Sequence, residues 1–181
     1  MLTRFILMVW AVGAPMAMAA DSVAPETGPA VENFGPVFAV PDGAFNLSND
    51  RHYKVSKDVS SSSDSPEEIN RGLESAARFL NMQARNGTPA DKLEMAVIVH
   101  GAAAKDLLSD KAYESRFDVS NPNTDMLAGL AAAGVKVYLC GQTAAYRGFS
   151  PQELNPRVTL ALSAMAAHVQ LQSEGFTLIP F

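Results

Sequence analysis

The chain has a single cysteine, Cys140, in the segment VKVYLCGQTAAYRGF (residues 135–149), where a strand-like run gives way to a helix-like one. A lone cysteine cannot form a disulfide within the chain, so it is a buried inert thiol, half of an intermolecular bridge or a reactive nucleophile. Free backbone N–H groups and the helix dipole at a helix start stabilise a thiolate and lower the thiol pKa. The position suits a nucleophile, although a small apolar residue ending a buried strand is the alternative.

His100 is the second residue whose type and place could serve chemistry. It directly follows the apolar run LEMAVIV, so it ends a predicted strand as Cys140 does. Ligands of open parallel sheets bind beyond the carboxyl ends of the strands, and consecutive strands are usually neighbours. His100 is therefore a candidate proton partner for Cys140 in one crevice, and a hydrogen-bonded structural histidine is the alternative.

Three further residues are candidates for ligand binding. Gly141 would let a substrate approach the backbone, and Arg147 follows two helical turns later, at the expected rim. Asn123 belongs to the segment NPNTDML, where Asn121 before Pro122 already has a simpler interpretation as a helix N-cap.

Other kinds of site are not expected from the sequence. His52 and His168 are far from His100 in the chain and lack ligand-type spacing, so no metal site is predicted. No G-x-S-x-G, G-x-G-x-x-G or Walker motif is present, which disfavours a hydrolase and a phosphate-binding loop. No cofactor is expected.

The elements that must position these residues alternate along the chain. Helical patterns follow most of the strands, and the segments Ser65-Pro66-Glu67-Glu68 and Ser150-Pro151-Gln152-Glu153 resemble capping boxes. This alternation predicts an α/β fold with a mainly parallel sheet and helices on both faces. The predicted strands are 53–59, 93–101, 135–140, 157–162 and 176–181.

The N-terminal region reads as a targeting segment. Residues 1–20 have one basic residue, an apolar stretch and small residues at the end, as in a secretory signal peptide, and the stretch is too short and interrupted to span a bilayer. We expect a periplasmic protein without a membrane span after cleavage. Residues 21–36 are predicted to be a flexible leader, and residues 37–181 one domain. The net charge of −5 makes nucleic acid an unsuitable partner.

The segments VKVYLCGQTAAYRGF, VHGAAAKDLL, NPNTDMLAGLAAAGV and VTLALSAMAAHVQLQSEGFTLIPF together resemble the DsrE/DsrF-like family of sulfur-relay proteins, in particular an exported branch. The resemblance runs from about Tyr53 to Phe181 and implies a three-layer α/β/α domain with a five-stranded parallel sheet that assembles into trimers or hexamers. It also implies that Cys140 accepts sulfur as a persulfide. His100, Asn123 and Arg147 belong to the exported branch's pattern, without an established role.

Two functions follow as hypotheses. The first is a periplasmic sulfur carrier or sulfurtransferase-like protein with Cys140 as acceptor, whose sulfur donor and acceptor the sequence does not identify. The second is a non-catalytic oligomeric protein that binds a small ligand in the crevice around His100 and Cys140. The sequence departs from the cytoplasmic relay proteins in its signal peptide, because a persulfide outside the reducing cytoplasm must survive oxidation.

Overall fold

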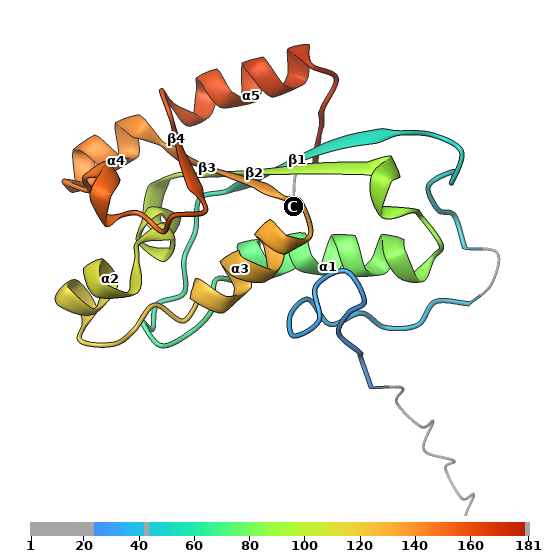
Figure 1. Cartoon of the computed structure of the whole chain (residues 1–181), viewed down its shortest axis with the longest axis horizontal. Helices are drawn as coiled ribbons and strands as arrows, with labels where there is room; N and C mark the ends of the chain where they lie inside the picture. The colour runs from blue at the N-terminus through green and yellow to red at the C-terminus, as the bar shows by residue number, and fades with distance from the viewer. Residues whose placement is uncertain (1–23, 42–43, 180–181) are drawn as a thin grey trace, which may run out of the picture.

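A computed structural model describes residues 24–41 and 44–179 and contains one five-stranded parallel sheet (Figure 1). The strand order is β4-β3-β2-β1-β5, so the first four strands follow one another across the sheet and the last pairs with β1. The predicted α/β fold and its parallel sheet are confirmed. The strands are β1 (Tyr53–Val59), β2 (Leu93–Val99), β3 (Lys136–Cys140), β4 (Val158–Ala161) and β5 (Thr177–Ile179).

The helices lie on both faces of the sheet. Because crossovers between parallel strands are right-handed, the reversal from β4 to β5 sends α5 across the face opposite to α1 and α3 (Figure 1). The helices are α1 (Arg71–Arg85), α2 (Asp110–Phe117), α3 (Thr124–Ala132), α4 (Gly141–Arg147) and α5 (Ala164–Ser173), and the 3-10 helices are η1 (Ala90–Lys92), η2 (Gly101–Leu107) and η3 (Pro151–Glu153).

Two hydrophobic cores of unequal size result from this arrangement. Strand β2 is buried on both faces, with Val97 and Val99 in the larger core and Ala96 and Ile98 in the smaller one. The larger core is closed by residues of α1, α2, α3 and α4. The smaller core, which lies under α5, consists of Ala96, Ile98, Cys140, Ala164, Leu171 and Phe176. Cys140 thus belongs to the smaller of the two cores, on the α5 side of the sheet.

The expected flexible leader is corrected by the structure for residues 24–36, which fold against α1. Val31 is 2% exposed and joins the larger core. The side chain of Asn81 accepts a hydrogen bond from the Val31 N–H at 2.7 Å and donates to the Val31 carbonyl at 3.0 Å. Arg85 binds the carbonyl of Gly28 and the carboxylate of Glu26. The composition of this segment, which is rich in Pro, Gly and Ala, does not indicate these contacts with α1.

The predicted signal peptide, residues 1–20, lies outside the described residues. In residues 24–41 and 44–179, the helices are all too short or too polar for a bilayer crossing.

The start of α1 also differs from the prediction. The Ser65 hydroxyl accepts a hydrogen bond from the Glu67 N–H in an exposed turn, and α1 begins six residues later at Arg71. Its N-cap is Asn70, whose side chain accepts from the N–H groups of Gly72 and Leu73 at 2.8 and 3.1 Å. The predicted Ser150–Glu153 capping box is present, on the 3-10 helix η3.

Asn70 is also the centre of a buried polar network. Its amide donates to the Asp106 carboxylate at 2.6 Å, and its backbone N–H donates to the side chain of Asn123 at 2.7 Å. Asn121 accepts from the backbone N–H of Asn123, two residues on, and donates to the carbonyls of Asp106 and Leu108. The network ties the start of α1 to η2 and to the start of α3.

We predict that Asn70→Ala lowers the free energy of unfolding by about 2 kcal/mol or more, because it removes a cap and leaves buried polar partners unsatisfied. Ser65→Ala should change it by less than about 0.5 kcal/mol, since the turn is exposed. Urea denaturation of both variants measures the difference. Equal losses would contradict the assignment of Asn70 as the cap.

Candidate functional site

Cys140 is both the last residue of β3 and the N-cap of α4, which begins at the next residue without a loop. The following glycine makes this junction fit against the end of β4. A Cβ at Gly141 would lie 2.5 Å from the Ala161 carbonyl oxygen and 3.1 Å from that of Leu162. The backbone that approaches Gly141 is therefore the chain's own, and it holds Cys140 close to the turn between β4 and α5.

The surroundings of the sulfur favour a thiolate although Cys140 is only 6% exposed. Burial raises the pKa of the thiol, but hydrogen bonds from the Thr143 hydroxyl and from the backbone N–H groups of Thr143, Ala164 and Gln142 lower it by more. The pKa of Cys140 consequently lies below its ordinary value. The groups that lower the pKa belong to the first turns of α4 and α5.

His100 follows β2 at the level of Cys140. The parallel register pairs Val99 with Leu139, so His100 and Cys140 follow the last paired residues of neighbouring strands. The His100 ring, however, lies against Asp58 of β1, with 3.0 Å between Nε2 and the carboxylate oxygen Oδ2. Its side chain is one-third exposed. The structure thus brings His100 to the predicted edge of the sheet and orients it through a carboxylate that sequence reasoning missed.

Asp58 holds a second histidine with its other oxygen. The Nε2 atom of His168, on α5, lies 2.8 Å from Asp58 Oδ1. Burial raises the pKa of Asp58, and the hydrogen bonds from His168 and His100 lower it by more, so the net pKa is below its ordinary value. The residues form a carboxylate-centred bridge, His100–Asp58–His168, between the sheet and α5.

The second ring nitrogen of His168 constrains its tautomer. His168 Nδ1 is buried and has no hydrogen-bond partner among the described residues. With the proton on Nε2, the ring donates to Asp58 and only an acceptor at Nδ1 stays unpaired. With the proton on Nδ1, a buried donor would be unpaired and Nε2 would face the carboxylate without a proton, which costs more. His168 is therefore assigned as a donor to Asp58.

The other two candidates lie away from the sulfur. Asn123 is fully buried in the Asn70 network on the α1 side of the sheet, where its side chain is occupied by Asn70 and Asn121. Arg147 is exposed in the last turn of α4. Within the described residues, His, Cys, Asp and Glu side chains form no group of three that could hold a metal ion.

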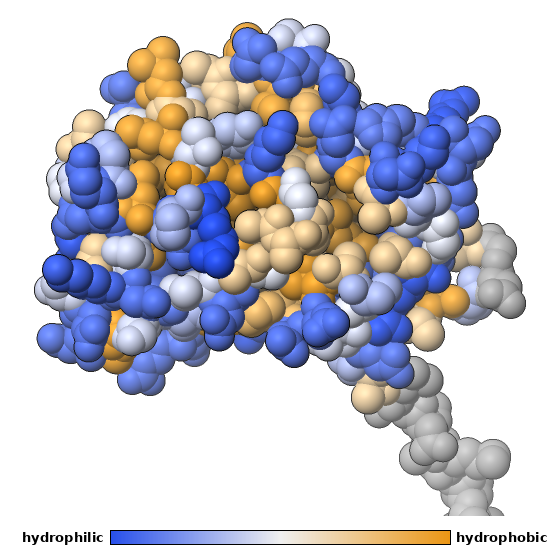
Figure 2. All heavy atoms as spheres, in the orientation of Figure 1, coloured by the Kyte–Doolittle hydropathy of each residue, from blue (hydrophilic) through white to orange (hydrophobic). Residues whose placement is uncertain are grey.

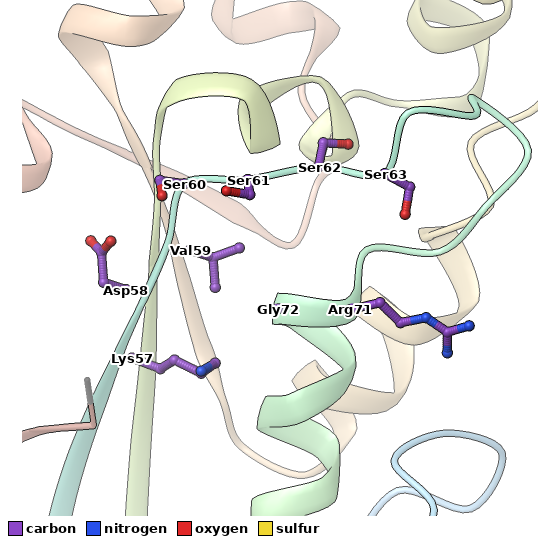
Figure 3. A pocket seen from close by; sticks show the side chains of 9 residues that line it. All are labelled: Lys57, Asp58, Val59, Ser60, Ser61, Ser62, Ser63, Arg71 and Gly72. Carbon is purple, nitrogen blue, oxygen red and sulfur yellow. The ribbon is translucent and has the colours of Figure 1, made fainter. Parts of the chain in front are cut away.

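A pocket of about 290 Å³ opens at the end of β1 on the α1 side (Figure 3). Figure 3 shows the side chains of Lys57 and Asp58, successive in β1, pointing to opposite sides. The pocket lies between this end of β1 and the start of α1, where the first amides of α1 are already taken by Asn70. It is lined by Lys57, Asp58, Val59, Ser60, Ser61, Ser62, Ser63, Arg71 and Gly72.

The sequence of the chain matches the model of a known family. The model of the DsrE/DsrF-like family matches residues 14–181. The chain belongs to this family. DsrE-like proteins are generally linked to sulfur relay. No curated protein sequence matches the chain significantly.

Two solved structures share the DsrE-like fold. The protein of unknown function MTH1491 from Methanobacterium thermoautotrophicum is 18% identical, with a TM-score of 0.53 over 71% of this chain and 99% of its own. The ychN protein from E. coli is 19% identical, with a TM-score of 0.51 and the same coverage of both chains. At such identities the likeness extends to the fold alone.

We predict that Thr143→Val raises the pKa of Cys140, because it removes the hydroxyl that most strongly favours the thiolate. Thr143→Ser, which keeps the hydroxyl, should stay close to the wild type. The pH dependence of alkylation by iodoacetamide gives the pKa of each variant. An unchanged midpoint in Thr143→Val would show that the hydroxyl does not stabilise the sulfur anion.

Proposed function

We propose that the protein is a periplasmic sulfur carrier that accepts sulfur as a persulfide on Cys140. The observation that carries the proposal is the position of Cys140, a buried sulfur at the end of β3 and at the N-cap of α4. The Thr143 hydroxyl and nearby backbone N–H groups lower the pKa of the thiol there. Membership of the DsrE/DsrF-like family supports it, because that family is linked to sulfur relay. An inert core cysteine has no need of donors that favour its charged form.

The reaction requires no external oxidant or reductant. The Cys140 thiolate attacks the terminal sulfur of a donor persulfide, a new S–S bond forms on Cys140, and the donor's S–S bond breaks. The donor leaves as a thiolate, which takes a proton from water or from a neighbouring acid. Transfer to the acceptor repeats the exchange in the opposite direction, so electrons and sulfur atoms balance in each step.

His100 is the acid–base group that we propose for these proton transfers. It stands at the level of Cys140 on the neighbouring strand, and Asp58 orients its ring. A carboxylate that accepts a hydrogen bond from imidazole fixes the tautomer and the orientation of the ring. The exposed third of the side chain leaves His100 accessible to a sulfur donor that approaches from solvent.

The low exposure of Cys140 suits a carrier outside the cytoplasm. At 6% exposure the sulfur meets little bulk solvent, which slows its oxidation to sulfenic and higher acids. The same burial restricts transfer to slender donors such as inorganic polysulfide or an extended persulfide. The proposal that the protein is exported rests on residues 1–20, whose sequence has the features of a signal peptide.

The competing function is a binding module that uses the crevice without chemistry at Cys140. It requires the same fold and the same assembly but no reactive sulfur. A Cys140→Ser variant separates the two, because it keeps size and hydrogen bonding while removing the nucleophile.

We predict that incubation with inorganic polysulfide adds the mass of one or more sulfur atoms to the wild type, reversibly with a reductant. Cys140→Ser should show no adduct and an unchanged melting curve, because the substitution leaves the junction intact. Intact-mass spectrometry checks both outcomes. An accessible thiol that alkylates but never gains sulfur would exclude the carrier function.

We also propose that the chain forms a homo-oligomer, a trimer or hexamer, through an apolar surface on α4, β4 and α5. Figure 2 shows hydrophobic residues at the upper left of the molecule, where α4 and the start of α5 lie. Strand β4 is an edge of the sheet, so its outer backbone groups are also available for contact. The exposed apolar residues there are Tyr146, Leu160, Leu162, Met165 and Val169.

A second copy is the expected occupant because large exposed apolar side chains gather on α4, β4 and α5 at one edge of the sheet, and such groups mark interaction surfaces. Leu162 and Met165 are each 77% exposed: Leu162 directly precedes the N-cap of α5, and Met165 lies in its first turn, beside Ala164, which packs in one cluster with Cys140. An interface here would therefore also close the site from solvent.

We predict that the double variant Leu162→Glu, Met165→Glu is a monomer, because two charges per copy would be buried at the interface. Phe45→Glu, at an exposed aromatic residue outside this surface, is the matched control and should assemble normally. Light scattering over a wide concentration range measures the mass. A wild type that is monomeric throughout that range would refute the assembly.

A further inference from the structure

Helix α5 is held to the sheet by few apolar contacts. Its buried residues are Ala164 and Leu171, one small and one near the far end, whereas Met165 and Val169 point to solvent. Among the described helices, α5 alone contributes residues to the smaller core. His168 lies between the two buried residues and is the polar anchor of the helix, with its side chain 19% exposed.

The anchor and the sulfur are connected by a short piece of helix. Ala164, the first residue of α5, packs in one cluster with Cys140. His168 is four residues later, so it stands one turn along the same face of the helix. Fixing His168 on Asp58 consequently fixes the position of Ala164 over the sulfur.

A second path leads from the bridge to the other side of Cys140. Asp58 orients His100, and the next residue, Gly101, directs its backbone N–H at the Thr143 hydroxyl oxygen at 3.4 Å. Thr143 lies in the first turn of α4, the turn that Cys140 caps. The contacts form a closed ring that runs from Cys140 through Thr143, Gly101, His100, Asp58, His168 and Ala164 back to Cys140.

We propose that Asp58 is a positioning residue for Cys140: by binding His168 and His100 with its two oxygens, it clamps the first turn of α5 and the His100–Gly101 backbone around the sulfur. The inference rests on the proposed function for its purpose, since the clamp keeps the sulfur acceptor ready for reaction. Asp58 lies on β1, two strands from Cys140, which is about 10 Å at the usual strand spacing. It acts through the two histidines and not by contact.

The sign of the effect distinguishes this role from simple electrostatics. Removing a negative charge at such a distance would by itself lower the pKa of a thiol, because the thiolate loses a like charge. Releasing the clamp has the opposite effect, since the Ala164 N–H and the Thr143 hydroxyl would no longer be held on the sulfur. A neutral substitution of Asp58 therefore gives opposite shifts under the two explanations.

The test is the pH profile of Cys140 alkylation by iodoacetamide in the intact, assembled protein. Asp58→Asn should move the midpoint upward by about one pH unit, the size of shift that hydrogen bonds to a charged group produce. Glu94→Gln removes the same charge from a carboxylate beside His52 and Lys54 on the same sheet and should not raise the midpoint. A midpoint that is unchanged or lowered in Asp58→Asn would overturn the proposal.

A pair of His168 variants keeps the test decisive if Asp58→Asn does not fold. His168→Ala removes the anchor and should raise the midpoint, whereas His168→Gln retains a side-chain N–H donor at a similar reach and should restore the wild-type profile. Equal profiles for the two variants would overturn the clamp.

The alkylation profile is independent of sulfur transfer, so the two proposals can fail separately. A low wild-type midpoint that rises in Asp58→Asn, without any sulfur adduct from polysulfide, would retain the clamp and reject the carrier. An adduct on the wild type with identical profiles in all variants would retain the carrier and reject the clamp.

Discussion

The site depends on the absence of a side chain at Gly141. The carbonyl oxygens of Ala161 and Leu162 lie 2.5 and 3.1 Å from where a Cβ would stand, so only glycine allows the β3–α4 junction to touch the end of β4. This contact brings the start of α5, three residues past Ala161, next to the sulfur. With a larger residue at this position the two chain segments would separate, and the Ala164 N–H would move away from Cys140.

The strand order brings further residues to the contact between Gly141 and the end of β4. Because β5 pairs with β1 at the edge opposite β4, the chain must cross the sheet from β4, and α5 carries it across β3 and β2. The crossing places one turn of α5 at Cys140 and the next at Asp58. One helix thereby links Cys140 at the end of β3 with a carboxylate on β1, and the outer face of the same helix carries the exposed residues Met165 and Val169.

The sequence predicted the five strands and the position of Cys140. It did not predict the contacts that depend on the order of the strands in the sheet. The alternation of apolar runs and capping signals located all five strands, and the lone cysteine marked the strand-to-helix junction. Asp58 and His168 are 110 residues apart, and only the crossing of α5 brings them together, so His168 carried no local signal. Asn70 and Asn123 were hidden for a similar reason, since their roles arise from contact between distant segments. The polar residues Ser56 and Asp58, alternating with Val55 and Val59 in β1, were the one available hint of a functional face.

The central claim is that Cys140 carries sulfur. The measurement that tests it most directly is intact-mass spectrometry of the protein isolated from its own cells without reductant, followed by mapping of the peptide that contains Cys140. The account predicts a fraction of molecules with additional sulfur on Cys140, which a reductant releases as sulfide. A Cys140 that is uniformly unmodified, in cells whose other persulfides survive the same isolation, would contradict it.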